Sequence, residues 1–366
     1  MFEIRNHILI KYHPPLTEEE IAEKAREAAA PKKVRHAVAS AWDLGTEVNA
    51  PAWDEASARE TIDPAEAADT EWVEDTDPEG RTVRVPENVT AIGDGAFFEC
   101  RRVEHIGLPA GLRSVGNNAF YGCLQLKEID LPDSVETIGS GVFQWCSQLT
   151  AIRLPAGLTK IPDAFAYGCK RLSALEIPDT VVSIGTGAFH WCSGLREIRL
   201  PEGLTEIPES CFHWCSSLTE IRIPDTARVI GMSAFSNCRK LRAPRIPETV
   251  TEIGFRAFCG CTGMQEIRLP DSVTEIGINA FSGCRNLTEI RFPAHIRKFS
   301  EWSFSDCRSL HAVHLPEGLE EITSRAFYGC AGIVDLEIPD GVRAIGDWCF
   351  YNCENLITVR LPARVT

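Results

Sequence analysis

Hydrophobic and polar positions recur along most of the chain with a period of 23 residues, and a proline opens every period. Counting that proline as position 0, a cysteine stands at position 14 in all twelve repeats and a phenylalanine at position 11 in eleven. In repeat 4, Phe165 and Ala166 are exchanged. Because so short a unit cannot bury its apolar side alone, the period predicts one stacked solenoid instead of several globular domains. The prolines are Pro86, Pro109, Pro132, Pro155, Pro178, Pro201, Pro224, Pro247, Pro270, Pro293, Pro316, Pro339 and Pro362.

Within one repeat, the apolar spacing changes from a strand period to a helix period. Positions 20 and 22, such as Ile152 and Leu154, alternate with polar residues and predict a half-buried strand. Positions 3 and 6 form a second extended apolar side, and a frequent glycine at position 7 predicts a turn. Seven repeats carry a helix N-cap residue at position 8, and positions 10, 11, 14 and 17 then follow a helical spacing. We therefore predict short strands and one short helical turn per repeat, stacked into a parallel β-sheet.

The recurring motif L-x-x-I-x-L-P-x-x-V/L-x-x-I-G-x-x-A-F-x-x-C, as from Leu126 to Cys146, resembles the BspA-like leucine-rich repeat family. Residues 2–12 resemble the N-terminal hairpin that often precedes such repeats, with His7 where glycine is usual in the turn. The resemblance implies a leucine-rich repeat solenoid over residues 86–366, with a capping hairpin in residues 1–85. It also implies a binding scaffold without catalytic residues or cofactors, and many members of the family are bacterial and surface-exposed.

The segment between the hairpin and the first repeat has a different composition. A capping box at its start predicts a short helix over residues 17–30, and a second helical stretch follows over residues 32–42. Residues 43–79 hold 13 acidic residues against one basic residue, which predicts a flexible acidic segment. The alternative is an arm that docks on a partner, because tryptophans are unusual in a pure linker. They are Trp42, Trp53 and Trp72.

Charge and hydropathy limit the function. The net charge of −15 argues against a nucleic-acid partner, since such proteins need a surplus of Lys and Arg. The longest apolar run near the start, residues 8–10, is too short for a secretory signal, and no run approaches a membrane span. We therefore expect a cytoplasmic protein without membrane insertion, or a cell-surface protein if an export signal is missing from this sequence. Known enzyme motifs such as the P-loop, G-x-S-x-G and H-E-x-x-H do not occur in the sequence.

The 15 cysteines allow two interpretations. Twelve stand at position 14 on the predicted buried side, and Cys211 and Cys349 replace the small residue at position 10, so core packing is one interpretation. A disulfide ladder or a metal site is the other, but zinc needs four converging ligands. We predict core packing and no metal, with Cys259 at position 12 as the candidate exposed thiol.

Positions 12 and 13 of repeats 3 to 6 give the first set of candidate binding residues. Other repeats mostly carry small or polar residues there, whereas aromatic residues are typical of interface hot spots. Either these side chains bind a ligand, or their rings lie over neighbouring turns and extend the core. His190 and His213 stand one repeat apart and either titrate together, bind a metal, or are a simple surface repeat. The set is Trp145, Tyr167, His190, Trp191, His213 and Trp214.

Position 21 gives the second set, a column of arginines that faces outward on the predicted strands. A column of glutamates at position 19, including Glu197, Glu220, Glu266 and Glu289, is predicted to lie beside it. Either the two columns neutralise each other, or the arginines recognise an acidic ligand or partner. The arginines are Arg153, Arg199, Arg222, Arg245, Arg268 and Arg291.

Together these features predict a non-enzymatic scaffold that binds a protein or peptide through the outer surface of repeats 3 to 6. The alternatives are a bacterial cell-surface adhesin or structural array protein, and an enzyme whose site is assembled only by the fold. Because no polar cap helix follows Pro362, the open end of the solenoid is expected to expose strand edges, which predicts an end-to-end homodimer.

Overall fold

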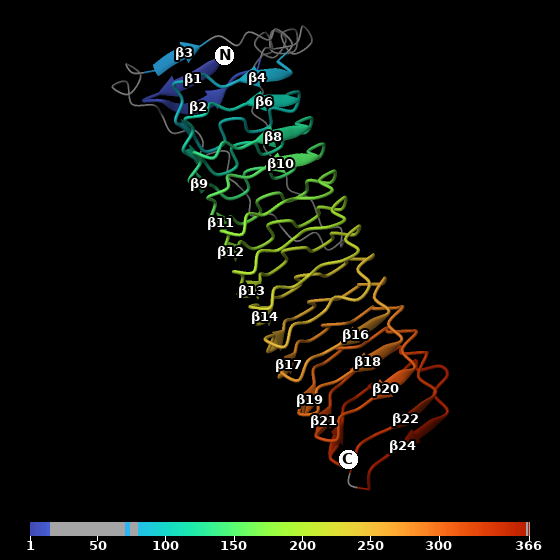
Figure 1. Cartoon of the computed structure of the whole chain (residues 1–366). Coiled ribbons are helices and arrows are strands. Elements are labelled where there is room, and N and C mark those ends of the chain that lie inside the picture. Colours follow the sequence, from blue (N-terminus) through green and yellow to red (C-terminus); the bar gives the residue numbers. More distant parts are fainter. Residues whose placement is uncertain (15–69, 74–79, 364, 366) are drawn as a thin grey trace, which may run out of the picture.

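The repeats stack into one long parallel β-solenoid, with the N-terminal hairpin at one end and the last repeats at the other (Figure 1). The structure is a computed structural model that describes residues 1–14, 70–73, 80–363 and 365. The solenoid, its parallel strand pairing and its 23-residue register confirm the predicted fold class. The predicted helices over residues 17–30 and 32–42 lie outside the described residues.

The hairpin caps the first repeat, as predicted. Strands β1 (Phe2–Arg5) and β2 (Ile8–Tyr12) pair antiparallel, and β2 pairs in parallel with β5 (Ala91–Ile92) of repeat 1. Asn6 and His7 both adopt left-handed backbone angles (φ 48° and 64°), as a two-residue type I′ turn requires. The hairpin therefore keeps this turn although a histidine occupies it.

One further strand joins the cap. Strand β3 (Thr70–Val73) pairs antiparallel with β1 on the side away from β2. It falls within residues 43–79. The sequence analysis gave two interpretations of this segment, a flexible acidic segment and an arm that docks on a partner. The rest of that segment lies outside the described residues.

Two series of short strands run along the solenoid. The first series lies at positions 19–21, and its members pair with the equivalent residues of the next repeat, as Ile129 does with Ile152. The second lies at positions 5 and 6, as in the pair Ile253 and Ile276. The first series comprises β4 (Thr82–Arg84), β6 (His105–Gly107), β8 (Glu128–Asp130), β10 (Ala151–Arg153), β16 (Glu266–Arg268), β18 (Glu289–Arg291), β20 (Ala312–His314), β22 (Asp335–Glu337) and β24 (Thr358–Arg360). The second begins with β5 and comprises β7 (Ser114–Val115), β9 (Thr137–Ile138), β11 (Lys160–Ile161), β12 (Ser183–Ile184), β13 (Glu206–Ile207), β14 (Val229–Ile230), β15 (Glu252–Ile253), β17 (Glu275–Ile276), β19 (Lys298–Phe299), β21 (Glu321–Ile322) and β23 (Ala344–Ile345).

The predicted helical turn is not found, and this corrects the sequence-based expectation. Positions 8 to 17 form successive tight turns, and no helix occurs in the described residues. Positions 9 and 13 take left-handed backbone angles in every repeat, as Asn118 (φ 51°) and Gly122 (φ 68°) do in repeat 2. A right-handed helix cannot continue through such residues. Their N–H groups donate to the next repeat instead, from Asn118 to the Ser140 carbonyl and from Gly122 to the Gln144 carbonyl, both at 2.8 Å.

A ladder of phenylalanine rings forms the centre of the core. Neighbouring ring centroids lie between 5.2 and 6.2 Å apart from Phe97 to Phe350. The rings of Phe143 and Phe189, in the repeats before and after, contact Phe165 of repeat 4 edge-on. Phe165 thus stays in the ladder from position 10, in spite of its exchange with Ala166. At the N-terminal end, Tyr12 of the hairpin packs against Phe97 with ring centroids 5.3 Å apart. The cap therefore continues the core of the solenoid.

All 15 cysteines are free thiols, and fourteen of them are buried. Position 14 places its thiol in the core next to the phenylalanine ladder, as expected for cysteines that pack as small apolar residues. Eleven of these thiols donate a hydrogen bond to the position-11 carbonyl of the preceding repeat. Cys259 is the exception in burial, since it is only partly covered.

Candidate functional site

The six aromatic candidates of repeats 3 to 6 come together on the turn edge of the solenoid, and we call them the aromatic cluster. Trp145 contacts Tyr167 and Trp191 edge-on, with ring centroids 5.2 and 5.7 Å apart. Tyr167 packs on His190 at 4.5 Å, and His190 packs on His213 at 4.5 Å. The sixth member, Trp214, lies next to His213 with centroids 6.3 Å apart. The cluster therefore spans four consecutive repeats without a break.

The three tryptophans of the cluster occupy a backbone position that suits other residues better. Trp145, Trp191 and Trp214 stand at position 13 with φ of 62°, 60° and 60°. A left-handed backbone costs a residue with a side chain roughly 1–2 kcal/mol relative to the right-handed one. The other nine repeats place Gly, Asn, Asp or Glu there, namely Glu99, Gly122, Gly168, Asn237, Gly260, Gly283, Asp306, Gly329 and Asn352. Bulky indoles at strained positions in one stretch of repeats mark this surface as a candidate site.

Gly168 explains how Trp145 reaches across two repeats. It takes position 13 of repeat 4, between Trp145 and Trp191, and a Cβ added there would lie 2.6 Å from the Trp145 ring. The indole of Trp145 thus lies over the glycine backbone and touches Trp191 beyond it. The ring covers a neighbouring turn, as one interpretation of the sequence expects, while all three tryptophans keep part of their surface exposed. The other interpretation, that these side chains bind a ligand, stays a prediction.

The two histidines of the cluster differ in their burial. His190 is only 9% exposed, and His213 is half-buried. Burial, followed by the positive charge of His213, lowers the pKa of His190 to about 3. Burial, followed by the charge of Arg256, lowers the pKa of His213 to about 4. Both imidazoles are therefore neutral near pH 7 and pack as aromatic rings.

Two cations border the cluster, and the sequence analysis missed both. The Lys170 ammonium lies 5.9 Å from the centroid of the Trp145 ring, and the Arg239 guanidinium lies 4.7 Å from that of Trp214. Such contacts stabilise a cation over an aromatic face. Their place in the repeat could have revealed them. Each cation stands at position 15 of the repeat that follows its tryptophan, two places after the position that the tryptophan occupies.

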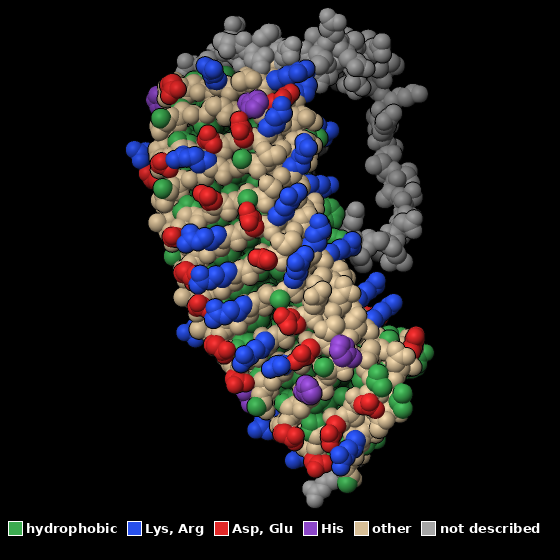
Figure 2. All heavy atoms as spheres, turned by 45° about the vertical axis from the view of Figure 1, so that its right-hand side comes forward, with side chains coloured by type: hydrophobic (Ala, Val, Ile, Leu, Met, Phe, Trp, Pro, Cys, Tyr) green, Lys and Arg blue, Asp and Glu red, His purple; other side chains and the backbone are tan. Residues whose placement is uncertain are grey.

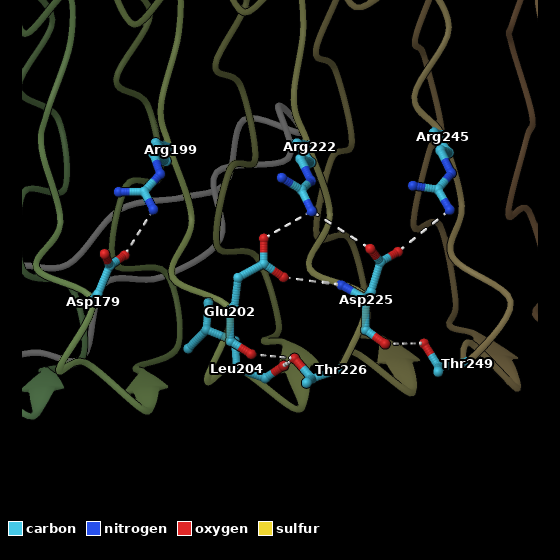
Figure 3. A network of polar contacts seen from close by, with 9 residues as sticks. All are labelled: Asp179, Arg199, Glu202, Leu204, Arg222, Asp225, Thr226, Arg245 and Thr249. Atoms are coloured by element: carbon cyan, nitrogen blue, oxygen red, sulfur yellow. Dashed lines mark hydrogen bonds and ion pairs between the residues drawn. The ribbon is translucent and has the colours of Figure 1, made fainter.

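The arginine column lies on the strand series at positions 19–21, away from the turn edge. Arg199 pairs with Asp179 at 3.0 Å, and Arg245 pairs with Asp225 at 3.4 Å. Both ion pairs are drawn as dashed lines in Figure 3. Arg222 binds both Glu202 and Asp225, at 3.0 and 3.5 Å. These partners stand at position 1, whereas the sequence predicted glutamates at position 19. Within the described part of the chain, Glu289 is the position-19 glutamate that pairs with an arginine of the column, Arg291, at 2.8 Å.

A shallow groove follows this column where the first strand series is interrupted. Between β10 and β16 the pairing is reduced to isolated bridges, such as the one between Arg199 and Arg222. The groove has a volume of about 1390 Å³, and small side chains such as Ala174 and Ala243 line it together with Arg and Glu. On the face turned forward in Figure 2, basic and acidic side chains alternate along the solenoid. Most arginines of the column are thus already neutralised, although Arg268 has no ion pair with another described residue.

The described residues contain no group of three or more His, Cys, Asp or Glu side chains placed to hold a metal ion. Within the same ranges, no helix has the length and apolar character needed to cross a lipid bilayer.

Known proteins share this architecture. The family model for the BspA type leucine rich repeat region, in six copies, matches residues 79–170, 159–287 and 228–357. A leucine-rich repeat protein from Bacteroides ovatus is 27% identical over 78% of this chain and 80% of its own, with a TM-score of 0.67. A leucine rich cell surface protein from Faecalibacterium prausnitzii is 28% identical over 76% of this chain and 87% of its own, with a TM-score of 0.53. No curated protein matches the sequence.

Proposed function

Because the chain belongs to the BspA type leucine-rich repeat family, we propose that it is a non-catalytic scaffold whose aromatic cluster binds a protein or peptide. The main support for this proposal is the left-handed backbone of Trp145, Trp191 and Trp214. Stability alone favours glycine or asparagine at this position, as most other repeats have. Strain that persists at three neighbouring sites supports a selected role for the indoles.

The chemistry of the cluster also supports protein binding. Tryptophan and tyrosine contribute most to interface hot spots because they bury a large area with few rotatable bonds. The cluster is ordered by its own ring contacts, so little side-chain freedom is left to lose on binding. The arginine column is a weaker candidate, because acids at position 1 already neutralise most of it.

Replacing the indoles tests the proposal without disturbing the turn. We would select peptides on the intact protein from a phage-displayed library of random short peptides and measure their affinities by fluorescence polarisation. In the variant Trp145→Asn/Trp191→Asn/Trp214→Asn, asparagine suits the left-handed backbone. The selected peptides are expected to lose at least about tenfold in affinity. Equal binding by this variant would refute the role of the cluster.

Trp302 provides the matched control. It also has a left-handed backbone (φ 58°) but stands at position 9 of repeat 10, outside the cluster. Trp302→Asn should leave the selected peptides bound as tightly as before, because the same chemical change is made elsewhere on the turn edge.

A cell-surface role is the second candidate. It is favoured by the Faecalibacterium prausnitzii protein, whose description is a leucine rich cell surface protein. Surface display would present the aromatic cluster to partners outside the cell, whereas a cytoplasmic location, as first expected from the sequence, would limit it to internal ones. Fractionation of the native cells, with protease treatment of intact cells, separates these locations.

We also propose that the last repeats associate with a second copy of the chain. Ile357 and Leu361 are 82% and 55% exposed, and β24 pairs with β22 alone among the described strands. An open strand edge beside apolar residues can pair with another edge. Light scattering should give a dimer mass that Ile357→Lys reduces to the monomer, and a monomer at high concentration of the unchanged protein would refute the association.

A further inference from the structure

Three consecutive repeats depart from the polar character of position 8. Met232, Phe255 and Ile278 occupy this position in repeats 7, 8 and 9, and they are 45%, 37% and 44% exposed. We call them the apolar strip. The other nine repeats carry polar residues there, namely Asp94, Asn117, Ser140, Asp163, Thr186, Glu209, Glu301, Ser324 and Asp347. Single exposed apolar residues are common, but three on adjoining rungs make one continuous surface.

The apolar strip gives up hydrogen bonds that polar residues make at the same position. The Asp94 carboxylate accepts a bond from the Asn117 N–H at 2.6 Å, and the Asn117 side chain accepts one from the Ser140 N–H at 2.9 Å. The Asp163 carboxylate does the same for the next repeat. Met232 and Phe255 offer no such acceptor. A net hydrogen bond contributes about 1 kcal/mol, so stability does not explain these substitutions.

Closely packed turns support the strip, and acidic residues bound it. A Cβ on Gly277 would lie 2.6 Å from the Phe255 backbone nitrogen, so neighbouring turns are packed in direct contact beneath the strip. Glu209 and Glu301 continue the column on either side and limit the strip to three rungs. At about 4.8 Å per rung, its outer side chains are about 10 Å apart along the solenoid.

An unpaired cation lies beside the strip. The Arg256 guanidinium stacks on the Phe255 ring with 4.9 Å to its centroid. Arg256 forms no ion pair with any residue in the described ranges. The strip therefore combines an apolar row with positive charge that an incoming carboxylate can meet.

We propose that the apolar strip docks a short amphipathic helix of a partner protein, with apolar side chains on the strip and a carboxylate on Arg256. Apolar residues at i, i+3 or i+4, and i+7 of a helix span about 10.5 Å, which matches the three rungs. An extended strand is a poorer match, because alternate side chains are separated by about 6.6 Å. The strip shares no residue with the aromatic cluster, although Arg256 lies close enough to His213 for its charge to act there, and the docking test does not depend on that of the proposed function.

Designed peptides test the docking directly. The probe is a fluorescein-labelled helical peptide with Leu at i, i+4 and i+7 and Glu beside them. One counterpart carries Lys in place of Glu, another Ser in place of Leu, and a third the same residues in strand alternation. Fluorescence polarisation should show binding of the Glu helix, with weaker binding at high salt and for all three counterparts.

The test variant restores residues that other repeats have at position 8. Met232→Asn/Phe255→Asn/Ile278→Ser should be at least as stable as the unchanged protein, because asparagine can accept the lost hydrogen bond, yet bind the Glu helix at least about tenfold less tightly. Arg256→Gln should lower affinity for the Glu helix and remove its salt dependence. Trp145→Asn should leave affinity unchanged, which keeps this result independent of the aromatic cluster.

Several outcomes would overturn the proposal. They are equal binding by the triple variant, equal binding of the Lys helix, preference for the strand peptide, and lack of binding by the Glu helix. Analytical sedimentation could also contradict it. If the unchanged protein is a dimer and the triple variant is a monomer, a second copy of the chain, and not a partner helix, covers the strip. Should the triple variant not fold, Ile278→Ser and Arg256→Gln would decide the question separately.

Discussion

The thiol of Cys215 donates a hydrogen bond of 3.1 Å to the backbone carbonyl of Phe189 in the preceding repeat. The same carbonyl also accepts the N–H of Cys192, at 3.1 Å. The contact explains why cysteine recurs at position 14: it fills the apolar space beside the phenylalanine ladder and also satisfies a buried acceptor in the neighbouring turn. Each repeat is thereby joined to the previous one by a side chain as well as by its backbone.

We expect Cys215→Ala to lower the free energy of unfolding by about 1–2 kcal/mol, because it removes a fully buried sulfur and its hydrogen bond. Denaturant unfolding followed by circular dichroism measures the effect. Cys259→Ala is the matched control, since this thiol is only partly covered and should matter less. Equal losses for the two variants would contradict the role assigned to position 14.

The period of the sequence was sufficient to predict the solenoid and the buried cysteines, and the resemblance of residues 2–12 to an N-terminal hairpin predicted the cap. The period was not sufficient to predict the backbone of the turns. Positions 10, 11, 14 and 17 show the same helical spacing whether the backbone forms a helix or forms turns interrupted by left-handed residues. The repeated glycines at position 13, such as Gly122 and Gly260, were the available signal for a left-handed backbone.

The candidate site was predicted in part. The aromatic residues were evident as departures from the repeat, but the contact of Trp145 with Trp191 depends on the missing side chain of Gly168. Likewise, the partner of Arg199 could not be identified from the sequence. It is Asp179 on the adjoining loop, and the path of that loop is set by the fold instead of by the strand alternation.

The reactivity of the cysteines should follow their burial and their pKa values. Burial raises the pKa of Cys192 to about 12 and also raises that of Cys259, so both thiols are protonated at neutral pH. Because the thiolate is the reactive form, iodoacetamide should modify the folded protein slowly, faster at higher pH, and first at Cys259. Peptide mass spectrometry identifies the site. Early modification of Cys192 in folded protein would contradict the prediction, and labelling in denaturant shows that every thiol can react.

Gly168→Ala should destabilise the protein and move the Trp145 ring. The new methyl group would meet that ring at 2.6 Å, on a backbone with φ of 75°, and the backbone alone costs roughly 1–2 kcal/mol. Thermal unfolding should show a lower melting temperature, and tryptophan fluorescence in the folded state should shift. Gly157→Ala in the same repeat is the control, because its added Cβ meets nothing within 4 Å. A fluorescence shift of equal size in both variants would contradict the packing described for Trp145.

The buried histidines predict that stability falls with acidification. His190 and His213 have pKa values of about 3 and about 4 in the folded state, below the value of about 6.5 expected when unfolded. The unfolded chain therefore binds more protons than the folded one between these values. Their stabilising effect is complete above about pH 6.5 and is lost as the pH falls through the folded values. Urea unfolding at a series of pH values should show this slope. The slope should be smaller in His190→Gln/His213→Gln, because glutamine does not bind a proton in this pH range. Position 12 accepts glutamine, as Gln144 in repeat 3 shows. An unchanged slope in the double variant would mean that other groups govern the acid response.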